Sequence, residues 1–361
     1  MADQLILVTG SGRSGTSSMS GTLHHLGLHV PGPYLGANTS NPKGFFESKW
    51  SVRFHNDLLS RAGVTIADSR PEAVDLIGGV IEPRDRRRLG AFLDRATAEH
   101  TQTVVKDPRI VWTHRLWEQE ASERGLSVAY VTMLRHPAEV VGSRLTYYSG
   151  TDGSQEKAVE RRAYAITNLA RWINVSLVNE RRTRGARRAF VRYADLLTDW
   201  RAVTTRLESE LGLEYAVAVA AETPSAVDDF LDSGLRRHGA GWDGVPVPES
   251  LSHLAEQVWE TLQGHCDGPD EPDDADASAP EAIGARLDEL AGRYADLRTD
   301  AVAFTRDGRG GAAPIRHREA PPAPVDPPGT DVRRVGDVGG RELLRIAARR
   351  AVGRLPRRSA R

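Results

Sequence analysis

The chain has 361 residues, with 48 Lys and Arg against 49 Asp and Glu, and this near-neutral balance argues against a generally nucleic-acid-binding surface. A single cysteine, Cys266, excludes an intramolecular disulfide framework and a cysteine-rich metal site, and it fits a reducing compartment. No apolar run approaches the roughly 20 residues of a membrane span, and no signal peptide precedes the first predicted strand, so a cytoplasmic location is expected.

Residues 5–18, LILVTGSGRSGTSS, predict a strand, a phosphate-binding turn and a helix in succession. Gly10, Gly12 and Gly15 permit backbone conformations that are closed to residues with a Cβ atom. A helix that follows such a turn begins with free backbone N–H groups, which attract anions together with the helix dipole. The segment therefore predicts an anion site, and the alternative is a glycine-rich turn without a ligand.

Two phosphate-binding motifs overlap in this turn, and neither is complete. The glycine spacing is that of a Walker A loop, but Thr16 replaces the lysine that reaches the β and γ phosphates, which disfavours a P-loop kinase. A dinucleotide site needs an acidic residue about 20 positions later, and residues 11–46 contain no Asp or Glu, so a dehydrogenase ranks last. What remains is a phosphate loop with its cation, Arg13, inside the turn and with the hydroxyls of Thr16 and Ser17 at the helix start.

The stretch GSGRSGTS resembles the 5′-phosphosulfate loop of the sulfotransferases that use 3′-phosphoadenosine 5′-phosphosulfate (PAPS). The similarity is to the bacterial and Golgi-type branch, with its tyrosylprotein and carbohydrate sulfotransferases, and it covers residues 5–213. It implies a P-loop-type three-layer α/β fold with a central parallel sheet, PAPS as the donor, 3′-phosphoadenosine 5′-phosphate (PAP) as the product, and no metal. The loop residues implied to bind the donor are Ser11, Gly12, Arg13, Ser14, Gly15, Thr16 and Ser17.

Residues 41–50, NPKGFFESKW, predict a loop that enters a helix, with Glu47 near the helix start. A glutamate at such a position often only complements the helix dipole. The NPKGFFE segment resembles the element after the first helix in which bacterial and Golgi sulfotransferases place a catalytic glutamate. The resemblance implies that Glu47 is the general base, which is the interpretation we favour.

Residues 103–105 predict a short buried strand that ends in the sequence KDPR, beginning with Lys106. A lysine at the carboxyl end of a parallel strand lies where ligands bind in open α/β sheets, and the alternative is a solvated surface lysine. The KDP motif is similar to that of tyrosylprotein sulfotransferases, which implies that Lys106 contacts the sulfuryl or bridging oxygen. Asp107 either orients Lys106 or Arg109 or is the second candidate for the base, and His114 is the third.

Residues 127–134, SVAYVTML, predict the clearest strand, followed by Arg135 and an amphipathic helix over residues 139–148. Ser143 lies eight positions after Arg135, a spacing that can bring a guanidinium and a hydroxyl to one phosphate. The same spacing forms the 3′-phosphate site of the sulfotransferase family, so the resemblance assigns both residues to that group. His136, beside a proline, is expected to be structural.

Residues 155–182 predict a long helix, with Ala163 and Trp172 among the residues of its apolar face, and residues 187–192 predict a fourth strand. Four strands that alternate with helices imply parallel pairing and right-handed crossovers. The VRYADLL segment resembles the family's RYEDL element, which implies that Tyr193 lies near the adenine. The alternative is that Tyr193 packs against the helix that follows it.

Past residue 213 the resemblance fades, and only residues 229–238 are similar to a late segment of bacterial members. There, Arg236 or Arg237 either reaches the 3′-phosphate or the acceptor or lies in a solvated turn.

The expected organisation is a sulfotransferase domain over residues 1–265, an acidic linker at 266–280, an amphipathic helix at 281–300, a disordered linker at 307–340 and a basic amphipathic helix at 341–361. That last helix lies on an anionic membrane, binds a partner or is a solvated tail. Elsewhere we expect an irregular segment at 68–79, an exposed charged helix at 82–100 and a helix at 246–264.

The leading hypothesis is transfer of a sulfuryl group from PAPS to a hydroxyl of a carbohydrate, glycolipid or other small molecule, with Glu47 as base and Lys106 and Arg13 stabilising charge. The alternatives are a P-loop kinase with a degenerate Walker A loop and a noncatalytic nucleotide-binding scaffold. The loops expected to line the acceptor pocket are residues 29–41, 68–79 and 147–156.

Overall fold

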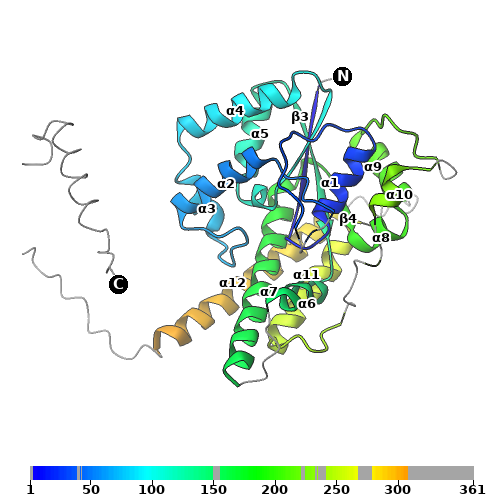
Figure 1. The fold of residues 1–361 in the computed structure, drawn as a ribbon. Coiled ribbons are helices and arrows are strands. Elements are labelled where there is room, and N and C mark those ends of the chain that lie inside the picture. The colour runs from blue at the N-terminus through cyan, green and yellow to red at the C-terminus, as the bar shows by residue number, and fades with distance from the viewer. Residues whose placement is uncertain are drawn as a thin grey trace, which may run out of the picture. The chain divides into compact units, whose positions relative to one another are not determined.

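The computed structural model describes residues 3–38, 41, 43–148, 155–220, 224–231, 234, 241–266 and 279–307. At its centre is a four-stranded sheet of order β2-β1-β3-β4, in which every pairing is parallel (Figure 1). The strands are β1 (Gln4–Gly10), β2 (Gln102–Lys106), β3 (Ser127–Leu134) and β4 (Arg187–Arg192). The predicted α/β fold with a parallel central sheet is confirmed.

Alternate side chains of each strand point to opposite faces of the sheet. Apolar side chains lie on both faces, and helices cover each of them. Ile6 and Val8 of β1 pack with α1 (Thr16–His25), α8 (Tyr193–Thr198), α9 (Trp200–Leu211) and α10 (Ala226–Phe230). Leu5 and Leu7 pack with α2 (Lys49–Ala62), α4 (Pro83–Thr97) and α5 (His114–Ser122) on the other face (Figure 1). The strands are therefore buried on both faces, in three layers.

A further apolar cluster joins four helices beside the carboxyl ends of β3 and β4. Its helices are α6 (Pro137–Tyr148), α7 (Gln155–Thr183), α11 (Glu249–Gln263) and α12 (Ala279–Asp307). Trp172 of α7 is 1 % exposed in this cluster, and α12 contributes Leu287, Leu290 and Tyr294. This packing holds α6 and α7 against the carboxyl ends of β1 and β3.

Several predicted elements differ from the structure. The segment at 68–79 contains the short helix α3 (Ala73–Gly78), which buries Ala73 and Ile77. Helix α4 was expected to be exposed, but one side of it is buried through Leu89, Phe92 and Leu93. Ala163 of α7 was expected on the apolar face of that helix, but it is exposed. Helix α12 begins at Ala279, inside the predicted linker, and continues to Asp307.

The contacts divide the chain into two compact units, Met1–Ala303 and Phe304–Arg361. Residues 267–278 and 308–361, which include most of the predicted linkers and the basic helix, lie outside the described residues, so the domain boundaries remain predictions. Arg236 and Arg237 also lie outside them. Among the described helices, none is both long and apolar enough to span a membrane.

Candidate active site

The glycine-rich turn connects β1 to α1 and leaves the start of the helix open. Gly15, the residue before α1, has φ +86° and no side chain that could cap the helix, and the first turn contains no acidic residue. The Ser14 hydroxyl is buried and has no hydrogen-bond partner in the described part of the chain. Uncapped N–H groups together with a buried, unsatisfied hydroxyl suit an anionic group at this turn.

Two of the glycines are required by close packing as well as by backbone conformation. A Cβ atom on Gly10 would lie 2.5 Å from the Met133 carbonyl oxygen of the neighbouring strand. A Cβ atom on Gly15 would lie 2.2 Å from Cδ2 of Tyr193. Tyr193 is therefore packed directly against the turn, and the turn has this shape only with glycine at both positions.

Replacing Gly15 with alanine is expected to abolish anion binding at the turn, because the added methyl collides with Tyr193 in addition to the cost of positive φ. Gly125→Ala is the matched control, since Gly125 also has positive φ, +69°, but nothing lies within 4 Å of its Cβ position. Thermal unfolding and calorimetric titration with PAP measure both variants. Equal effects of the two substitutions on PAP affinity would contradict a specific role for the Tyr193 contact.

Cationic and hydroxyl side chains gather on one side of the turn. Nε and Nη2 of Arg13 donate to Ser143 Oγ at 3.3 and 3.2 Å. Nη1 of Arg135 donates to the Arg13 carbonyl at 3.1 Å, and its Nε donates to Glu139 at 2.9 Å. The Arg135 guanidinium also lies 5.1 Å from the centre of the Tyr193 ring. The predicted pair of Arg135 and Ser143 thus meets at Arg13, with Tyr193 beside it.

Arg144 also belongs to this group, although the sequence analysis did not identify it. Its Nη2 donates to the Gly12 carbonyl at 3.2 Å, and its Nη1 donates to Asn168 Oδ1 at 3.0 Å. The residue follows Ser143 in α6, but which side of this helix faces the turn depends on packing against α7. The only sign of this role in the sequence is that Arg144, a cationic residue, directly follows Ser143, which is a predicted phosphate ligand.

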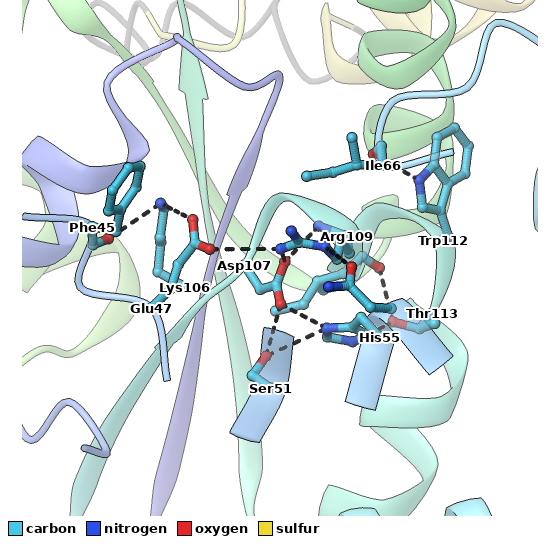
Figure 2. A network of polar contacts seen from close by, with 12 residues as sticks. Phe45, Glu47, Ser51, His55, Ile66, Lys106, Asp107, Arg109, Trp112 and Thr113 are labelled. Atoms are coloured by element: carbon cyan, nitrogen blue, oxygen red, sulfur yellow. Dashed lines mark hydrogen bonds and ion pairs between the residues drawn. The ribbon is translucent and has the colours of Figure 1, made fainter. Parts of the chain in front are cut away.

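Lys106 and Glu47 meet at the carboxyl end of β2 (Figure 2), and Ser17 joins them there. Nζ of Lys106 donates to Glu47 Oε1 at 2.5 Å, to Ser17 Oγ at 3.1 Å and to the Phe45 carbonyl at 3.2 Å. Lys106 and Glu47 are 3 % and 5 % exposed, so the ion pair is screened weakly by solvent. Glu47 precedes α2 and pairs with Lys106, so it does not act as a first-turn acid of that helix.

Asp107 anchors the segment that follows Lys106. Its Oδ2 accepts hydrogen bonds from Ser51 Oγ at 2.9 Å and from His55 Nδ1 at 2.8 Å. Its Oδ1 accepts from Nη1 and the backbone N–H of Arg109, at 2.8 and 2.9 Å (Figure 2). Trp117 Nε1 donates to His55 Nε2 at 3.0 Å, so the proton of a neutral His55 lies on Nδ1 and points to Asp107.

These contacts argue against both lower-ranked candidates for the base. Burial raises the pKa of Asp107, but His55 and Arg109 outweigh burial and hold that pKa below its usual range. Because both of its oxygens are occupied and it is fully buried, Asp107 is a positioning residue. His114 is also buried, and it lines a different cavity from the one beside the turn.

The depressed pKa of Asp107 predicts an acid-sensitive contribution to stability. This contribution is present above the ordinary carboxyl pKa of 3.8 and is lost as the pH falls through the lower folded-state value. Asp107→Asn is expected to cost about 3–5 kcal/mol at pH 7, and less as the pH falls below about 4. Urea unfolding at pH 7 and pH 3 tests this against Asp300→Asn, an exposed carboxylate of α12. An equal cost of Asp107→Asn at both pH values would contradict the assignment.

A cleft of about 310 Å³ opens beside the turn. One wall carries Gly10, Gly12, Arg13 and Arg144, and the rest is lined by Phe45, Ile66, Ala67, Pro108, Tyr164 and Val175. None of these described lining residues falls in the loops predicted to form the acceptor pocket. The cleft therefore has a cationic wall at the turn and a mostly apolar remainder.

The comparisons with known proteins give structural neighbours only, because no family model and no curated protein matches the chain. A sulfotransferase domain of an olefin synthase from Synechococcus PCC 7002 matches with 19 % identity and a TM-score of 0.40, over 72 % of this chain and 94 % of that one. A sulfotransferase domain from the curacin biosynthetic pathway matches with 16 % identity and a TM-score of 0.36, over 72 % and 98 %. Sulfotransferase STF1 from Mycobacterium tuberculosis H37Rv matches with 14 % identity and a TM-score of 0.32, over 72 % and 77 %. At these levels, function has to be argued from the residues of the site.

Proposed function

We propose that this protein transfers a sulfuryl group from PAPS to a hydroxyl group of a small acceptor. The observation that supports this most is the meeting of Lys106, Glu47 and Ser17 at the start of α1. A buried cation and a carboxylate stand where a phosphate turn enters its helix, and this is the pair of groups that sulfuryl transfer to an alcohol requires.

In the proposed donor site, the backbone N–H groups of residues 11–16 and the Ser14 hydroxyl bind the 5′-phosphosulfate. Arg13 also contacts the 5′-phosphosulfate, and Arg135 and Ser143 bind the 3′-phosphate, with Arg144 as a further cation. Tyr193, beside Arg135, contacts the adenine. Glycine at position 15 and the unsatisfied Ser14 hydroxyl support the fit of an anionic ligand to this turn.

The proposed reaction forms a bond between the acceptor oxygen and sulfur, and it breaks the bond between sulfur and the oxygen bridging to phosphorus. Glu47 accepts the hydroxyl proton, and Lys106 stabilises the negative charge that develops on the bridging oxygen. PAP leaves with that oxygen. Positioning and charge stabilisation supply most of the catalysis in such transfers, and the proposed steps use no metal. In the described residues, no three His, Cys, Asp or Glu side chains form a metal-binding group.

The cleft beside the turn is the proposed acceptor site. Phe45 connects it to the transfer centre, since its carbonyl accepts from Lys106 and its side chain lines the cleft. The apolar lining favours an alcohol on an apolar body, such as a glycolipid or another small hydrophobic molecule, over a highly charged polymer. A cytoplasmic location and a membrane contact through residues 341–361 remain predictions.

The experiment that tests this proposal is calorimetric titration with PAP in the absence of metal, with ATP plus Mg²⁺ and NADPH as comparison ligands. ATP is included because Lys106 supplies a lysine close to the turn that lacks the Walker lysine. PAP is expected to bind tightly, and Arg135→Ala is expected to weaken it by about 1.5–3 kcal/mol, or more than tenfold. Arg95→Ala, an exposed arginine of α4, is the control, and thermal unfolding checks that each variant folds.

Tight binding of ATP or NADPH without binding of PAP would refute the proposal. PAP binding without turnover of PAPS by a panel of alcohols would instead favour a noncatalytic nucleotide-binding scaffold.

A further inference from the structure

A second cavity, of about 370 Å³, lies at the other end of the short helix η1 (Pro108–Trp112). It is lined by residues of α3, α4, η1, α5 and α7 and is open to solvent on one side. Trp112, Val111, Leu116 and Ile81 give it an apolar lining. None of the residues assigned to donor binding or transfer lines it.

Guanidinium groups surround this cavity and outnumber the carboxylates. Arg86, Arg115 and Arg182 line it, whereas Asp75 is the only carboxylate among its described lining residues. Arg182 lies 4.0 Å from Asp75, and Arg86 lies 3.8 Å from the buried Glu120 behind the wall. Arg115 is exposed and makes no ion pair within the described residues. Among the described residues, Arg115 is therefore the one guanidinium of this cavity that no carboxylate pairs with.

His114 lies in the wall of this cavity and is 2 % exposed. Burial and then the nearby charge of Arg182 lower its pKa to about 3, while the neighbouring Asn179 side chain opposes this shift. The imidazole is therefore neutral at pH 7 and adds no charge to the arginines of the wall.

We propose that this cavity is a second ligand site, which binds a small organic oxyanion carried on an apolar body. The arginines would bind the oxyanion, and Trp112 would contact the apolar part. Trp112 Nε1 donates to the Ile66 carbonyl at 3.1 Å, so a wall residue of this cavity is hydrogen-bonded to a wall residue of the cleft beside the turn (Figure 2). The inference does not depend on sulfuryl transfer.

The test is calorimetric titration of the full chain with naphthalene-2-sulfonate, and with the uncharged naphthalene-2-sulfonamide as a probe of nearly the same shape. Wild type is expected to bind the sulfonate at one saturable site that persists when PAP is present. The double variant Arg115→Gln/Arg182→Gln should weaken this binding about tenfold or more, because it removes two charged partners. Arg181→Gln is the matched control, since Arg181 neighbours Arg182 in α7 but pairs with Asp288 at 3.3 Å.

Four results would overturn the proposal. Three are sulfonate binding that the double variant leaves unchanged, sulfonamide binding as tight as sulfonate binding, and no saturable sulfonate binding up to millimolar concentration. The fourth is displacement by PAP, which would mean that the probe occupies the glycine-rich turn instead. Because the rim arginines are exposed or partly exposed, their substitution tests the site without disturbing the buried core.

Discussion

Replacing Glu47 with glutamine is expected to lower kcat about 10²–10⁴-fold, because the amide cannot accept the proton of the acceptor hydroxyl. The substitution keeps the shape of the side chain and a hydrogen-bond acceptor for Lys106. PAP affinity should not fall, because Glu47 contacts Lys106 and Arg109 and none of the residues assigned to the two phosphates. Initial rates with radiolabelled PAPS and a panel of aryl and alkyl alcohols measure the effect.

Glu99→Gln, at an exposed position, serves as the control for the loss of one carboxylate. Unchanged kcat in Glu47→Gln would remove Glu47 as the base. It would also leave the proposed mechanism without one, since the oxygens of Asp107 are taken by Ser51, His55 and Arg109.

Replacing Lys106 with methionine is expected to lower kcat about 10²–10³-fold, the usual cost of removing one charge-stabilising donor. It should also cost about 3–5 kcal/mol of stability, because Glu47 would remain buried without its closest cation. Arg109 reduces that cost, since its Nη1 lies 3.6 Å from Glu47 Oε2. Steady-state kinetics and urea unfolding together measure the two effects.

The double variant Glu47→Gln/Lys106→Met separates the two effects. With neither member of the Glu47–Lys106 ion pair left, it should be more stable than Lys106→Met alone, yet it should be no more active. Lys49→Met, at an exposed position of α2, is the matched control. Recovery of both activity and stability in the double variant would mean that Lys106 stabilises the fold and takes no part in catalysis.

The parts of the fold that could be predicted from the sequence are those with a local pattern. The strands β3 and β4 coincide with residues 127–134 and 187–192, because each contains a buried apolar run, which is AYVTML in β3 and AFV in β4. The turn was predictable because its glycines are required by backbone conformation. Helix α3 was missed because six residues are too short to show a helical period.

The residues of the candidate site could be proposed one by one from the sequence, but the contacts between them could not. Glu47 and Lys106 are 59 positions apart, and nothing in either segment indicates that they form an ion pair. The contacts of Asp107 with Ser51 and His55 span 56 and 52 positions. Such contacts depend on how α2 docks on the sheet, which side-chain periodicity does not determine. The role of each residue in turnover remains a prediction.

The contact between Gly15 and Tyr193 also limits how the turn can be altered. A side chain at position 15 would need the space that the Tyr193 ring occupies, and the same ring lies beside Arg135. A residue larger than glycine at position 15 therefore needs a smaller side chain at position 193. Libraries that vary position 15 alone should return mostly destabilised chains, whereas libraries that vary positions 15 and 193 together should return folded chains with an altered turn.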